Sequence, residues 1–136
     1  MERIRKGFKV APDGSILAKY GSESFPCGGI AQIQVSIEAT TNSKIKFVLS
    51  EEIKSKYIYD DSDICTAKDI PTCYRSAIFA GAEETYLKAN SSEGIEFTLI
   101  SAFVHPTDTN EMVFKYTGKI ALAGWYQLQL DSDIIS

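Results

Sequence analysis

Residues 120–130 read Ile-Ala-Leu-Ala-Gly-Trp-Tyr-Gln-Leu-Gln-Leu, and this run constrains the fold more than any other stretch of the chain. The large aliphatic residues and the tyrosine occupy even-numbered positions, whereas alanine, tryptophan and glutamine occupy the odd-numbered ones. A β-strand places successive side chains on opposite faces. The spacing therefore predicts a half-buried antiparallel strand over 120–130.

The same two-residue period returns in the first half of the chain. A turn at 11–15, which contains Pro-Asp-Gly, separates segments 4–10 and 16–20 and predicts a β-hairpin. Segments 31–37 and 45–49 alternate in the same way across a polar turn. We expect these two segments to form a second hairpin.

Residues 83–89 present a conflict between two patterns. Glu84 and Lys88 form an i,i+4 pair, and the composition of the segment favours a helix. Its apolar residues nevertheless alternate, and the short interval between turn signals suits a strand, so we predict a strand. Alternation predicts two further strands at 74–80 and 112–116.

Residues 95–104 begin with a clear alternation and then become largely apolar on both faces from Ile100 to Val104. This change predicts either a central strand that is covered on both faces or a β-bulge that switches the faces.

These patterns amount to about eight or nine short strands with little helix. We therefore predict an all-β fold, a single antiparallel β-sandwich over residues 1–136. A jelly-roll-like topology is favoured over an immunoglobulin-like sandwich or a barrel. Trp125 follows all three cysteines, which departs from the cysteine–tryptophan–cysteine order of immunoglobulin domains. The inward parity of the clearest strands predicts one shared core: Ile33, Val35, Ile37, Ile45, Phe47, Leu49, Phe97, Leu99, Tyr126 and Leu128.

The charge balance argues against some classes of partner. The chain contains 14 Lys and Arg against 18 Asp and Glu, for a net charge of −4. We therefore expect no nucleic-acid partner. No apolar run approaches the ~18 residues of a membrane helix, so we expect no membrane insertion. The first residues are charged and lack the apolar core of a signal peptide, which predicts cytoplasmic synthesis.

The three cysteines are an odd number, which argues against a complete disulfide framework. Cys27 and the single histidine, His105, are the one pair that would suit a cysteine-dependent hydrolase. With Cys65 and Cys73 they would formally supply a zinc site, but the short spacing of zinc knuckles is missing. We expect reduced thiols, no catalytic activity and no cofactor. A Cys65–Cys73 disulfide stays open as an alternative for a protein that works outside the cell.

The longest loop that we expect, residues 60–73, begins with a cluster of oxygen ligands. Asp60, Asp61 and Asp63 carry the hard carboxylates that calcium prefers, and residues 131–133 repeat this character. The glycine and glutamate of an EF-hand loop are absent from both places. Solvated acidic turns are the favoured interpretation, and calcium binding is the alternative.

Trp125, Gln127 and Gln129 would share the outer face of the predicted 120–130 strand. An exposed indole stacks on a sugar ring while the amides bond to its hydroxyl groups, and the same side chains suit a protein–protein contact. Burial of Trp125 under a neighbouring loop is the favoured interpretation, and the protein contact and the sugar platform are the alternatives. Because this outer face has no charge, we also expect it to be covered by another subunit or by the 60–73 loop.

A short β-sandwich without a signal peptide, rich in Ser, Thr, Asn and Tyr, is similar to small virion components such as phage tail, fibre or decoration domains. It is similar also to carbohydrate-binding modules. The resemblance implies a non-catalytic structural or interaction domain that self-associates, for example within a virion. The alternatives are a glycan-binding module that uses Trp125, Gln127 and Gln129 and, more distantly, a Cys27-dependent hydrolase.

Overall fold

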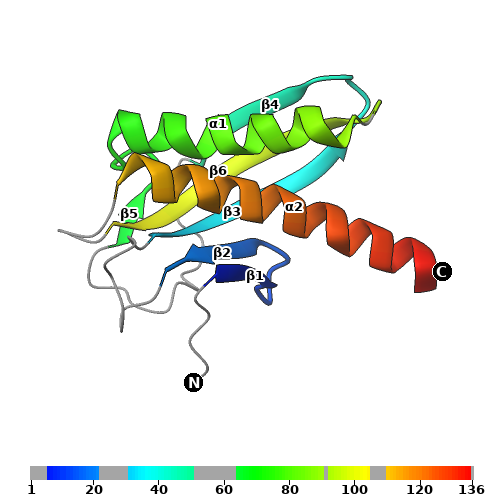
Figure 1. Cartoon of the computed structure of the whole chain (residues 1–136), viewed down its shortest axis with the longest axis horizontal. Helices are drawn as coiled ribbons and strands as arrows, with labels where there is room; N and C mark the ends of the chain where they lie inside the picture. Colours follow the sequence, from blue (N-terminus) through cyan, green and yellow to red (C-terminus); the bar gives the residue numbers. More distant parts are fainter. Residues whose placement is uncertain (1–5, 22–30, 51–63, 91, 105–109, 136) are drawn as a thin grey trace.

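A computed structural model of the chain describes residues 6–21, 31–50, 64–90, 92–104 and 110–135. In these residues a six-stranded sheet is covered on one face by two long helices (Figure 1). The elements in chain order are β1 (Lys6–Val10), β2 (Ile16–Tyr20), β3 (Ala31–Thr40), β4 (Ile45–Leu49), β5 (Ile64–Thr66), α1 (Thr72–Ala89), β6 (Gly94–Val104) and α2 (Glu111–Ile135).

The topology of the sheet overturns the predicted β-sandwich. The strands lie in the order β1-β2-β3-β6-β4, and β5 also pairs with β6. All pairs are antiparallel except β4 and β6, which are parallel. One mixed sheet with one layer of helices is an α/β arrangement, so the all-β, antiparallel, jelly-roll-like prediction is wrong.

The first predicted hairpin is confirmed as β1 and β2. Ala11 donates its backbone N–H to the Ser15 carbonyl over 2.8 Å, and Gly14 adopts a φ of +89° in the turn. The Asp13 carboxylate accepts hydrogen bonds from the backbone N–H and the hydroxyl of Ser15 at 2.9 and 2.6 Å. The Pro-Asp-Gly sequence thus encodes the turn locally.

The predicted second hairpin is wrong, because β4 does not pair with β3. Strand β6 lies between them, so that Ile37 of β3 and Phe47 of β4 both pair with Phe97. A tight turn cannot join parallel strands. Helix α1 lies in the connection from β4 to β6 and packs on the sheet.

Strand β6 confirms the predicted β-bulge in residues 95–104. It is an inner strand of the sheet, and the bulge lies where Gln34 pairs with Ser101 but Val35 pairs with Leu99. Ile100 therefore has no partner on β3. The bulge switches the faces, because Leu99 and Ala102 both belong to the core although their parity differs.

The remaining predicted strands are helical. Segments 74–80 and 83–89 belong to α1, and segments 112–116 and 120–130 belong to α2. On α2 the buried positions include several small residues that leave no clear period in a hydrophobicity pattern, which explains the error: Thr117, Gly118, Ala121 and Gly124.

Local signals fix the helix ends. Helix α1 follows Pro71 and ends at Ala89. The next residue, Asn90, adopts the left-handed conformation and donates its N–H to the Leu87 carbonyl. Before α2, the Asn110 side chain accepts a hydrogen bond from the Val113 N–H at 3.1 Å. Neither helix has the length and hydropathy needed to cross a membrane in the part of the chain that is described.

The helices and the sheet enclose one core, and all of the predicted core residues belong to it or pack against it. Tyr126 and Leu128 do so from a helix rather than from a strand. The opposite face of the sheet holds a buried polar chain. Gln34 donates to the Ser15 hydroxyl at 3.0 Å and accepts from the Ser101 hydroxyl at 3.2 Å, which ties the β1–β2 turn to β3 and β6.

Candidate functional site

A groove of about 560 Å³ lies between the first halves of α1 and α2. Most of the residues along it are exposed, so the groove opens to solvent. It is lined by Cys73, Ser76, Ala77 and Ala80 of α1 and by Glu111, Met112 and Lys115 of α2.

The outer face of α1 and α2 has an unusual composition for a solvent-facing surface. Cys73, Ser76 and Ala80 are exposed on α1, and Met112 on α2 is 64% exposed. Further along α1, Leu87 is 67% exposed. Of these two large side chains, Met112 lines the groove, whereas Leu87 lies outside its lining.

Two glycines bring the helices together below the groove. A Cβ atom at Gly81 would overlap the Lys115 carbonyl oxygen, and a Cβ atom at Gly118 would overlap the Ile78 carbonyl oxygen. The backbones of the two helices are therefore in direct contact, and no side chain separates them. This contact sets the spacing of the two helices that form the walls of the groove.

A lysine cluster continues from the groove along the helix pair. The Glu84 carboxylate lies 3.5 Å from Lys88 Nζ, 3.3 Å from Lys115 Nζ and 3.2 Å from Lys119 Nζ. Hydrogen bonds from Lys119 and Lys115, together with their charges, lower the pKa of Glu84 to about 2. The carboxylate is therefore ionised at neutral pH.

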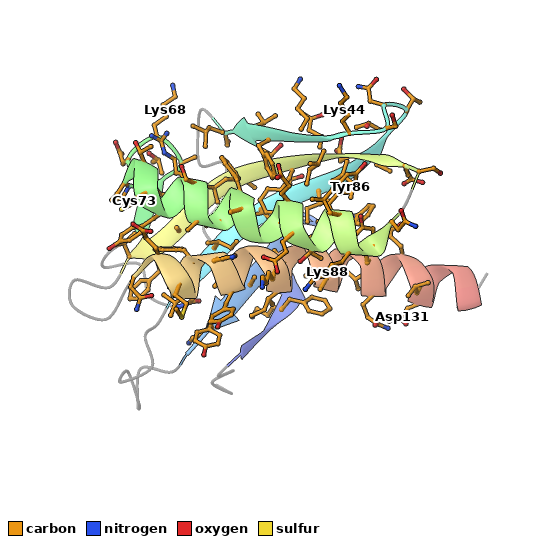
Figure 2. The ribbon with its side chains drawn as sticks, turned by 45° about the horizontal axis from the view of Figure 1, so that its top comes forward. Lys44, Lys68, Cys73, Tyr86, Lys88 and Asp131 are labelled. Carbon is orange, nitrogen blue, oxygen red and sulfur yellow. The ribbon has the colours of Figure 1, made fainter. Side chains whose placement is uncertain are left out.

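The cluster and the groove lie on the same layer of the molecule. Figure 2 shows Cys73 near the start of α1 and Lys88 near its end. Lys44 and Lys68 point away from the helix pair in the same view. These two exposed lysines therefore serve as references for charge effects that do not involve the groove.

The structure does not bring the predicted binding residues onto one face. Trp125 is only 9% exposed and belongs to the core, whereas Gln127 and Gln129 are exposed on α2. Gln127 donates to the Asp131 carboxylate at 3.1 Å. Residues two apart on a helix point in different directions. A sugar platform built from these three side chains therefore loses the exposed indole that it requires.

The other predicted sites fall largely outside the described residues. This holds for Cys27, for His105 and for the calcium candidates Asp60, Asp61 and Asp63. Residues 64–66 of the expected long loop form β5 instead, and Thr72 and the cysteine after it begin α1.

Cys65 and Cys73 do not form a disulfide with each other; Cys65 is half-buried and Cys73 is exposed. The described part of the chain contains no group of three or more His, Cys, Asp or Glu side chains that could hold a metal ion.

Sequence reasoning missed the groove, although one signal for its surroundings was present. Glu84 and Lys88 have the i,i+4 spacing of a helix, and so do Lys115 and Lys119. Taken together, these two pairs would have indicated two helices, each with charged side chains along one face. The groove itself depends on which helix faces lie side by side, and sequence spacing alone does not contain that information.

Comparison with known proteins gives little further guidance. No family model and no curated protein match the chain. Among solved structures, the chain is similar to the crystal structure of ttk003000868 from Thermus thermophilus, with 15% sequence identity and a TM-score of 0.46. The match covers 86% of this chain but only 14% of that protein.

Proposed function

We propose that this chain is a non-catalytic interaction domain that binds a protein partner through the outer face of α1 and α2. One observation carries the proposal: the strongly exposed Met112 lines a groove whose α1 wall is made of small side chains and whose charged lining residues are Glu111 and Lys115. Apolar side chains that enter such pockets supply much of the binding energy of protein interfaces. Met112, with its adaptable thioether, suits the rim of the pocket.

The proposal keeps the class of function expected from the sequence but moves the contact surface. The sequence pointed to residues 120–130, whose Trp125 is now part of the core. The self-association expected from the sequence would be one form of this function, with a second copy of the chain as the partner. The suggestion that the chain is part of a virion stays a prediction.

Site-specific photo-crosslinking in cells of the source organism tests the proposal. A photoreactive phenylalanine analogue replaces Ser76, which is exposed and lines the groove, or Ala123, which is exposed on α2 outside it. We expect a discrete crosslinked product from position 76 and none from position 123. An Ala80→Lys substitution in the same chain is expected to abolish the product from position 76. The matched substitution Ala123→Lys, outside the groove, is expected to leave that product unchanged.

The mass of the product distinguishes a second copy of the chain from a different protein. The absence of a product at position 76, or equal products from both positions, would refute the proposed surface. Circular dichroism of each variant excludes unfolding as the cause of a lost product.

A further inference from the structure

The groove and the lysine cluster share one residue. Lys115 lines the groove, and its Nζ atom also lies 3.3 Å from the Glu84 carboxylate. Glu111, Lys115 and Lys119 follow one another at intervals of about one turn along α2. The groove therefore has an acidic side chain at one end and leads into the lysine cluster at the other.

The lysine cluster has more positive than negative charge. Lys88, Lys115 and Lys119 contribute three positive charges, and Glu84, which its low pKa keeps ionised, contributes one negative charge, leaving +2. The side chains of Lys88 and Lys115 are 76% and 45% exposed, so both reach solvent as well as Glu84. The cluster can therefore meet a further anionic group.

The charge of the whole chain decides between two kinds of anionic partner. Subtracting +2 for the cluster from −4 for the chain leaves −6 elsewhere. An extended polyanion such as a nucleic acid would be repelled by the rest of the surface. A short protein segment with one or two carboxylates can contact the lysine cluster without extending over the negatively charged surface around it.

Resting on the proposed function, we propose that the partner is a protein segment with an apolar anchor side chain and an acidic residue on one side of it. The anchor occupies the groove beside Ala80 and Met112, and the Asp or Glu lies at the Lys115 end. Glu111 at the opposite end disfavours a second acidic residue there. This arrangement fixes the direction of the segment along α2.

Selection from a phage-displayed random-peptide library tests this partner class. The full chain is immobilised, and binders are depleted on Ala80→Lys, which fills the groove with a charged side chain. Ala123→Lys adds the same residue at an exposed position outside the groove and serves as the matched control. We expect enriched peptides to carry a large apolar residue next to Asp or Glu, and to bind the wild type and Ala123→Lys but not Ala80→Lys.

The affinity of one enriched peptide tests the charge contacts. We expect Lys115→Gln combined with Lys119→Gln to weaken binding about tenfold at low salt, and the distant pair Lys44→Gln with Lys68→Gln to leave it unchanged. A peptide with Lys in place of its acidic residue is expected to lose binding to the wild type. This last arm requires no protein variant and so does not depend on folding of the mutants.

The outcomes separate this inference from the proposed function. Enriched peptides that require the groove but are basic or uncharged would refute the acidic partner and leave the interaction surface intact. Peptides that bind Ala80→Lys as well as the wild type, or no enrichment at all, would refute the groove as a binding site.

Discussion

Phe97 of β6 contacts aromatic side chains from both the sheet and a helix. Its ring is fully buried and makes edge contacts with Phe47 of β4 and Phe79 of α1, at centroid distances of 5.8 and 6.2 Å. We expect Phe97→Ala to lower the free energy of unfolding by roughly 3–5 kcal/mol, because the cavity cannot collapse between two other rings. Urea denaturation measures the loss, and Phe97→Leu should lose less. A loss under about 1 kcal/mol for Phe97→Ala would contradict this packing.

Glu84 gives a prediction about pH. Its pKa is about 2 in the folded protein against an ordinary value of 4.5, so the folded state binds the proton less tightly than the unfolded state. The ion pairs therefore stabilise the fold fully above pH 4.5, and this contribution disappears as the pH falls towards 2. We expect wild type to exceed Glu84→Gln in stability at neutral pH, and the difference to vanish near pH 2.

Urea denaturation of both proteins across this pH range measures the effect. Glu83→Gln is the matched control, since Glu83 is the exposed neighbour on the same helix. Added salt should also reduce the difference at neutral pH, because the Glu84 cluster is partly exposed to solvent. A difference that stays constant from pH 7 to 2 would show that the carboxyl acts through packing instead.

At the level of whole elements, the crossing of α1 and α2 depends on Gly81 and Gly118. Glycine to alanine in an ordinary helix stabilises it by about 1 kcal/mol. Here the added methyl group would meet the backbone of the facing helix. We expect Gly81→Ala and Gly118→Ala each to destabilise the protein by about 1–3 kcal/mol.

Chemical denaturation gives the sign of these two changes, and the sign is the informative result. Ser76→Ala on the exposed face of α1 is the control, with an expected change within about 0.5 kcal/mol. Stabilisation by either glycine substitution would mean that the helices are farther apart than described.

The sequence predicted some elements well because their signals are local. The β1–β2 hairpin follows from alternation around Pro-Asp-Gly, and the bulge in β6 follows from a change of parity near Ile100. The helices were missed for two physical reasons. Helix α2 buries small residues such as Ala121 against its neighbours, and α1 exposes apolar residues such as Leu87. Both features hide the helical period that normally distinguishes helix from strand.

For the whole molecule, the sheet topology predicts a gradient of local stability. Strands β3 and β6 have neighbours on both sides, whereas β1 is at the edge of the sheet. We expect the β3 and β6 amide protons to exchange with solvent only on global unfolding, and those of β1 to exchange through local opening. Hydrogen exchange followed by NMR measures these rates. Protection of β1 equal to that of β6 would contradict the described order.

The topology itself was beyond what spacing along the chain could predict. Alternation shows that residues 31–37 and 45–49 are strands, but it does not show that β6 lies between them. That choice depends on α1, which must cover the sheet while the chain passes from β4 to β6. The candidate groove shares this dependence, since both of its walls are helices that the alternation concealed.

The position of β6 has a consequence for how the protein is made. A growing chain that has left the ribosome as far as Leu49 contains β3 and β4, but not the strand that pairs with both of them. Unpaired strand edges are templates for pairing with the wrong chain. We expect the nascent chain to stay unfolded in this region until α1 and β6 have emerged. The synthesis of α1 and β6 therefore determines when β3 and β4 stop being exposed to aggregation.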